Sequence, residues 1–209
     1  MIGTVDDFQS IICVTGHKGA GKDEFCKRMG ERWYHASVRF SDPIRAEAVK
    51  QYGPSYTVEQ LVEIGNEGRR QGGAGYWAER LMDFATENRW DCIVINGARN
   101  PAEIAMAASR SAPNFALVGI TAPIMTRYAR IAKRGQTEDR AQLEKFLAMD
   151  DTDRGLGQPE DGQQVDRCMA QVPRGCLYNN AGTLTEYHAW VDEVYTQILL
   201  DRIRTVPIP

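Results

Sequence analysis

The stretch Gly16-His17-Lys18-Gly19-Ala20-Gly21-Lys22-Asp23 decides the fold. It joins the apolar run 11–15 to residues 24–29, which read as the start of a helix. A Gly-x4-Gly-Lys turn between a strand and a helix is typical of a phosphate-binding loop, whose backbone amides and helix dipole hold an anion. Lys22 adds a charge for the terminal phosphates, and Asp23 stands where Ser or Thr usually holds Mg2+. The sequence therefore predicts a site for ATP and Mg2+, with Asp23 at the metal. The predicted cofactor-binding residues here are Gly16, His17, Lys18, Gly19, Ala20, Gly21, Lys22, Asp23 and Glu24.

Length and composition indicate one domain, residues 1–209, of ordinary globular composition. The net charge of −3 gives no general attraction to nucleic acid or to a membrane. No apolar run approaches the roughly 20 residues that span a bilayer, and the N-terminus lacks the pattern of a signal peptide. The five cysteines contain no Cys-x-x-Cys pair. A cytoplasmic location is expected, in the host cytoplasm if the protein is viral, and the sequence predicts no oligomeric state.

Apolar runs alternate with helical patterns along the chain, which predicts a parallel α/β sheet of about five strands in three layers, α/β/α. Thr57 and Thr183 each begin a capping box before a helix. In such folds, ligands bind at the carboxyl ends of the strands. The expected strands are 11–15, 36–40, 91–96, 115–121 and 175–180.

Arginines cluster around the second and third of these strands. Asp42 follows strand 36–40 and is either a site residue or simply a helix cap. The segment Gly65–Gly75 is predicted to be a flexible, arginine-bearing loop, and 76–88 an amphipathic helix that buries Trp77, Leu81 and Phe84. Arginines at a strand edge suit the phosphate of an acceptor, although a solvated surface is the alternative for each one. The acceptor-binding region is placed at 41–90, and the candidate acceptor residues are Asp42, Arg45, Arg69, Arg70, Arg80 and Arg99.

Two further patterns concern charge near the phosphates. Asn96 ends strand 91–96 where an Asp or Glu is usual; it can orient a metal-bound water but cannot neutralise the ion. Arg127, Arg130 and Arg134 share one helical face, which a fold tolerates best around an anion. Residues 136–166 become polar and acidic. The region 127–166 is predicted to form a mobile helical lid, with a solvated helical hairpin as the alternative.

The order of these motifs resembles the nucleoside-monophosphate-kinase-like branch of P-loop kinases over nearly the whole chain. Within that branch, the Gly-Lys-Asp loop resembles viral deoxynucleoside monophosphate kinases, dephospho-coenzyme A kinase relatives and animal-type phosphomevalonate kinase. The runs 96–100 and 180–184 resemble the Asp-Gly-x-Arg-Asn and Asn-x-Gly-Thr-Leu motifs of a dephospho-coenzyme-A-kinase-like group. The resemblance implies a P-loop NTPase fold with a helical lid. It also implies that Arg127, Arg130 and Arg134 approach the transferred phosphoryl group, and that Asn180 and Gly182 border the adenine.

These patterns together predict an ATP- and Mg2+-dependent kinase of a small nucleotide, with a (deoxy)nucleoside monophosphate as the favoured acceptor. One alternative acceptor is the hydroxyl of a modified pyrimidine, free or in DNA, as in viral DNA modification; another is dephospho-coenzyme A. A nucleic acid is possible but not favoured, and an NTP-binding switch is the alternative from another class. Asp42 would be the base for a hydroxyl acceptor. The candidate catalytic residues are Lys22, Asp42, Arg130 and Arg134.

Overall fold

The computed structural model describes residues 10–110, 114–135 and 140–200. Within these residues, five parallel strands form one sheet in the order β2-β3-β1-β4-β5. The apolar runs of β1, β3 and β4 are buried on both faces, which explains why they take the three central positions of a parallel sheet. The predicted sheet is confirmed. Its strands are β1 (Ser10–Gly16), β2 (Ala36–Arg39), β3 (Cys92–Ala98), β4 (Phe115–Thr121) and β5 (Leu177–Asn179).

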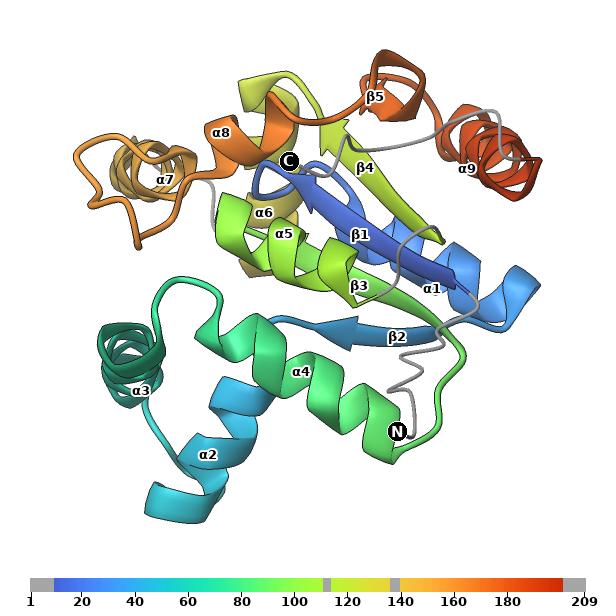
Figure 1. Cartoon of the computed structure of the whole chain (residues 1–209). Helices are drawn as coiled ribbons and strands as arrows, with labels where there is room; N and C mark the ends of the chain where they lie inside the picture. The colour runs from blue at the N-terminus through green and yellow to red at the C-terminus, as the bar shows by residue number, and fades with distance from the viewer. Residues whose placement is uncertain (1–9, 111–113, 136–139, 201–209) are drawn as a thin grey trace, which may run out of the picture.

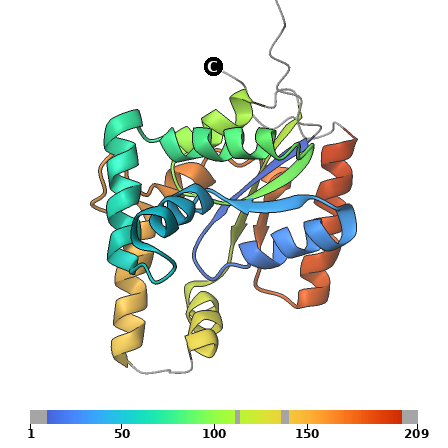
Figure 2. The same ribbon diagram turned by 90° about the horizontal axis from the view of Figure 1, so that it is seen from below.

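Helices cover both faces of the sheet, so the domain has the predicted three layers (Figure 1). Alternate residues of β1 point to opposite layers. Ile11 and Cys13 pack with α4, α5 and α8, whereas Ile12 and Val14 pack with α1 and α9. Figure 2 shows α6 and α7 beyond the carboxyl ends of the strands. The helices are α1 (Lys22–Trp33), α2 (Asp42–Tyr52), α3 (Val58–Gly72), α4 (Tyr76–Glu87), α5 (Pro101–Ser109), α6 (Ile124–Gly135), α7 (Arg140–Arg154), α8 (Val165–Met169) and α9 (Leu184–Leu199).

The flexible loop predicted at Gly65–Gly75 is wrong, because α3 continues through most of it. Gly68 has a packing role: a Cβ there would lie 2.5 Å from the Trp77 ring, so only glycine lets α3 approach α4 this closely. The Trp77 indole N–H also donates to the Gly65 carbonyl at 3.0 Å. Tertiary packing therefore overrides the low helix propensity of these glycines.

Three smaller predictions are also corrected. Phe84 is 48% exposed and is not part of the buried face of α4. Asp42 lies in the first turn of α2 without capping it, and its carboxylate accepts the Arg39 backbone N–H at 2.8 Å. The last strand is shorter than expected because a 3-10 turn, Arg174–Cys176, precedes β5.

The predicted lid at 127–166 corresponds to α6, α7 and the segment that leads to α8, while residues 136–139 lie outside the described part. Val165 and Cys168 are buried, so α8 belongs to the core. The capping boxes at Thr57 and Thr183 are confirmed. None of the helices in the described ranges is long and apolar enough to cross a membrane.

Candidate functional site

The predicted phosphate loop connects β1 to α1 at the carboxyl edge of the sheet (Figure 1). Gly16 adopts φ 141°, and a Cβ there would lie 1.9 Å from the Ile120 carbonyl oxygen, so the loop turns tightly against β4. Lys22 Nζ donates to the carbonyls of Gly16 at 2.6 Å and His17 at 3.0 Å. The Ala20 N–H donates to the same His17 carbonyl at 3.1 Å. Lys22 is therefore held inside the loop by the backbone that would surround a phosphate.

The electrostatics around Lys22 favour an added anion. Burial lowers the pKa of Lys22 from 10.5 to about 8; the Asp153 carboxylate opposes this shift and the Arg99 charge adds to it. Burial also lowers the pKa of Lys18; the Asp153 carboxylate again raises it and the Arg99 charge again lowers it. A phosphate among these cations would restore the stability of their charged forms.

Asp23 joins groups from three other elements. Asn96 Nδ2 donates to Asp23 Oδ1 at 2.8 Å, Arg39 Nη2 lies 3.5 Å from the same oxygen, and Arg134 Nη1 lies 3.7 Å from Oδ2. Arg39 was missed from the sequence, although it ends β2 in register with Asn96. In the described ranges, no group of three or more His, Cys, Asp or Glu side chains could hold a metal ion. A single carboxylate still fits Mg2+, which keeps several waters and takes its other ligands from substrate phosphates.

Two of the three arginines on α6 brace the loop. Arg127 is buried in a paired ionic contact with Asp150 of α7, with Nη2 2.9 Å from Oδ2, and donates to the Lys18 carbonyl at 3.3 Å. Arg130 donates to the carbonyls of Ala20 at 3.3 Å and Asn180 at 3.0 Å. The side chain of Arg134 is 66% exposed. For Arg127, the expected compensating anion is therefore a carboxylate of the protein itself.

The other predicted nucleotide-binding residues divide between support and surface. Asn180 is buried and donates to the Ala20 carbonyl at 2.9 Å, so it supports the loop; contact with adenine stays a prediction. Gly182 is in the exposed turn before α9. Glu24 Oε1 lies 2.8 Å from His188 Nε2. Lys18 Nζ reaches Met149 Sδ at 4.0 Å.

Arg99 stands beside the loop because of the capping box that begins α5. The Glu103 carboxylate accepts the backbone N–H of Arg99 at 2.8 Å and of Asn100 at 3.2 Å. The pKa of Glu103 is raised because burial outweighs the opposite effect of these two N–H groups and of the charges of Arg99 and Arg69. Arg99 directly follows β3, Arg69 lies on α3, and the charges of both act on Glu103. Arg99 Nε is also 3.5 Å from Asp153 Oδ1, and Arg69 donates to Asn66 at 2.8 Å.

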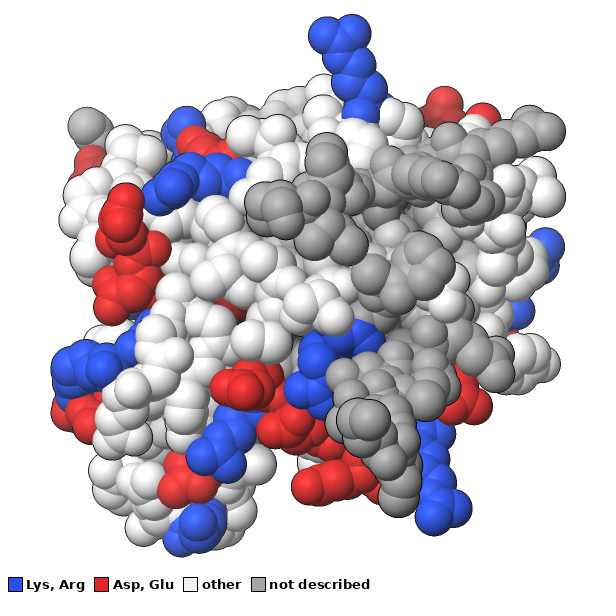
Figure 3. Space-filling view, in the orientation of Figure 1, with Lys and Arg blue, Asp and Glu red and all other residues white. Residues whose placement is uncertain are grey.

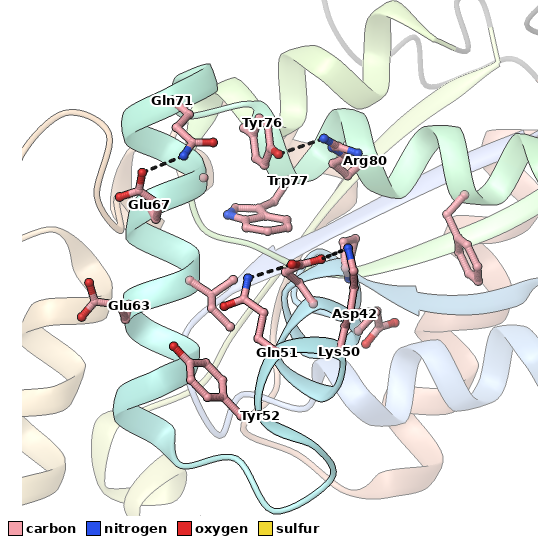
Figure 4. A pocket seen from close by; sticks show the side chains of 16 residues that line it. Asp42, Lys50, Gln51, Tyr52, Glu63, Glu67, Gln71, Tyr76, Trp77 and Arg80 are labelled. Carbon is pink, nitrogen blue, oxygen red and sulfur yellow. Dashed lines mark hydrogen bonds and ion pairs between the residues drawn. The ribbon is translucent and has the colours of Figure 1, made fainter.

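The remaining acceptor candidates lie elsewhere. Asp42 and Arg80 line a cavity of about 860 Å3 between α2, α3 and α4, whereas Arg45, Arg69 and Arg99 do not (Figure 4). In this cavity Arg80 stacks 5.1 Å from the centre of the Tyr76 ring and donates to its hydroxyl at 3.0 Å.

Arg70 and Arg45 lie outside this cavity. Arg70 is exposed and pairs with Glu67 of its own helix, and Arg45 donates to the Tyr56 hydroxyl at 3.3 Å. The six predicted acceptor residues therefore do not form one site.

Comparison with known proteins places the chain in a family. No protein family model matches it. A UPF0200 protein from Thermoplasma acidophilum is 31% identical over 144 residues, which cover 67% of this chain and 75% of the relative. Another from Methanoregula boonei is 29% identical over 185 residues, or 88% of this chain and 95% of the relative.

Solved structures show the same fold at low sequence identity. Shikimate kinase from Bacteroides thetaiotaomicron has a TM-score of 0.52 at 14% identity and covers 92% of this chain and 98% of its own. A gluconokinase from Sinorhizobium meliloti has a TM-score of 0.50 at 14% identity and covers 93% and 96%. The fold is that of P-loop kinases, as the sequence predicts, and the chain belongs to the UPF0200 family.

Proposed function

We propose that this protein is an ATP-dependent phosphotransferase whose acceptor is a small nucleotide, with a (deoxy)nucleoside monophosphate preferred. The observation that carries the proposal is the place of Arg99 at the carboxyl edge of the sheet: it follows Ala98, which pairs with Thr15 of β1 just before the phosphate loop. Its charge acts on both Lys22 and Lys18. Phosphoryl transfer depends mainly on positioning two anionic groups and on compensating their charge.

The residues divide between donor and acceptor. Lys22 and the loop amides would hold the β- and γ-phosphates, and Asp23, oriented by Asn96, would face the metal. Mg2+, when bound, would neutralise charge that develops on the phosphates. Arg134 is exposed and close enough to Asp23 to act on the transferred group. Arg127 and Arg130 would act indirectly, through the loop carbonyls that they hold.

On the acceptor side, Arg99 and Arg69 suit a phosphate that is already ionised. Such an acceptor needs no general base, and the Asp42 carboxylate is engaged with the Arg39 N–H on the side of the separate cavity. Lys and Arg alternate with Asp and Glu on the face in Figure 3, which offers a DNA backbone no continuous basic track on that face. A free nucleotide is therefore the acceptor that we favour.

Transfer of labelled γ-phosphate from ATP to a panel of acceptors tests this proposal. The panel holds deoxynucleoside monophosphates, dephospho-coenzyme A and DNA containing hydroxymethyluracil, and we expect label in a monophosphate. Lys22→Ala should abolish transfer; substantial residual transfer would exclude the assignment. Arg99→Gln should raise the acceptor KM by about 10- to 100-fold, as expected for loss of a charged hydrogen bond. Arg80→Gln removes the same charge from the separate cavity and should have the smaller effect.

Thermal shift distinguishes a kinase from a switch. ATP together with one monophosphate should stabilise the protein beyond ATP alone, because each ligand that binds only the folded state adds its own free energy. If no acceptor adds to the effect of ATP, the protein is an NTP-binding switch.

A further inference from the structure

His17 lies in the phosphate loop, but its side chain points away from the phosphate-binding backbone. Its Nδ1 lies 3.0 Å from Thr121 Oγ1 at the end of β4, and its Nε2 lies 2.9 Å from Asp166 Oδ1 on α8. Because an ionised carboxylate can only accept, Nε2 donates this hydrogen bond. The side chain is 16% exposed. The His17 imidazole therefore fixes the position of the His17 backbone, whose carbonyl accepts a hydrogen bond from Lys22.

Asp166 uses its second oxygen for a different element. Arg154, the last residue of α7, donates from Nε to Asp166 Oδ2 at 3.0 Å. Burial raises the pKa of Asp166, but the hydrogen bonds from His17 and Arg154 outweigh it and the pKa is lowered. The carboxylate is thus charged near neutral pH and bridges the loop and α7. Val165 and Cys168 anchor α8 in the core, so the bridge has a rigid base.

A second contact joins the next loop residue to the same helix. The Lys18 carbonyl accepts from Arg127, which is itself paired with Asp150 of α7. Consecutive loop residues are therefore tied to α7 at two points. In charged networks of this kind, the effects of single substitutions are not independent.

We infer that Asp166 and His17 are positioning residues that couple the placement of α7 to the geometry of the phosphate loop. A shift of α7 would move Arg154 and, through their hydrogen bond, the Asp166 carboxylate. Because Asp166 also bonds His17, the His17 carbonyl that accepts from Lys22 would move as well. Binding of a ligand that contacts α7 would thereby change the affinity of the loop for triphosphate. The statement about triphosphate rests on the proposed function, whereas the coupling itself does not.

Hydrogen exchange of the ligand-free protein tests the coupling directly. Arg154→Gln and Asp166→Asn should each speed amide exchange across residues 17–22 by about tenfold, equivalent to roughly 1.4 kcal/mol and within the range for coupled contacts. Arg167→Gln and Asp161→Asn remove the same charges from exposed neighbouring positions and should leave these amides unchanged. A purely structural role of Arg154 would alter exchange in α7 and leave the loop as it was, and that result would overturn the inference.

Two substitutions of His17 provide a matched pair. The amide of Gln can occupy the place of Nε2 and reach Asp166, whereas the amide of Asn can occupy only the place of Nδ1 and reach Thr121. His17→Gln should therefore restore most of the loop protection that His17→Asn loses. The fold-changes that His17→Asn and Asp166→Asn each cause in the ATP dissociation constant should not multiply in the double variant, because both substitutions break the same hydrogen bond. Multiplying effects, or equal loss in the two His17 variants, would contradict the coupling.

Hydrogen exchange of the loop tests the coupling, and ATP binding tests the proposed function, so either can fail without the other. If the wild-type protein binds no ATP but loop exchange responds to Arg154→Gln, the coupling holds and the proposed function fails. If ATP binds normally and the loop amides do not respond, the coupling fails and the proposed function stands.

Discussion

The lowered pKa of Lys22 predicts that ATP affinity falls as the pH rises through about 8. In the ligand-free protein, burial makes the charged ammonium unfavourable, so Lys22 loses its proton near pH 8 instead of near 10.5. Bound triphosphate would place negative charge beside Nζ and raise the pKa again. Binding above pH 8 must therefore take up a proton. Below pH 8 Lys22 is already charged and adds no pH dependence.

The size of the effect follows from linkage. With a free-state pKa of about 8, roughly one tenth of Lys22 is protonated at pH 9. ATP should bind about tenfold more weakly at pH 9 than well below pH 8, with uptake of about 0.9 proton per ATP. The contribution of Lys22 to the stability of the ligand-free protein changes with pH in the opposite direction to ATP affinity. Between pH 8 and 10.5 the unfolded chain holds the proton and the folded protein does not, so the free energy of unfolding rises with pH.

Calorimetric titration of ATP in two buffers of different ionisation enthalpy measures the proton uptake. The triphosphate has lost its own last proton at these pH values, since a phosphate monoester has a second pKa of about 6. Lys22→Arg is the matched control because a guanidinium stays charged to about pH 12 or above. No uptake at pH 9 in the wild-type protein, or equal uptake in Lys22→Arg, would refute the reasoning.

Two stability predictions follow from the packing. Arg127→Met should destabilise the protein by about 3–5 kcal/mol in urea denaturation, because it leaves Asp150 charged and buried; adding Asp150→Leu should recover most of the loss. If the double variant is no more stable than the single one, charge burial is not the cause. Gly68→Ala should lower stability by about 1–3 kcal/mol through its clash with Trp77. Gly65→Ala has space and should raise stability by about 0.5–1 kcal/mol through helix propensity, so equal effects of the two would contradict the packing argument.

Local patterns predicted most of the architecture correctly. The spacing of Gly16, Gly21 and Lys22 requires a tight turn between strand and helix, and the structure has one. Runs that are apolar at every position belong in the middle of a parallel sheet, where β1, β3 and β4 lie. The largest failure concerned a glycine-rich segment. In Gly65–Gly75, composition suggested flexibility, but Gly68 provides close contact with a tryptophan nine positions later.

The sequence by itself determined that a strand, a tight turn and a helix follow one another at the phosphate loop. It also determined the helix starts at Thr57 and Thr183 and which charged residues stand near the strand ends. Only the tertiary structure decided how those charges pair. With 25 Lys and Arg against 28 Asp and Glu, a sequence offers many equivalent ion pairs. The partners of Arg127 and His17 are 23 and 149 positions away, and spacing carries no information about contacts at that range. Folding joined His17 to α7 through Asp166 and placed Asp42 and Arg80 along a separate cavity. It also paired Arg127 with Asp150 and set it against the loop, because a buried charge must find a partner.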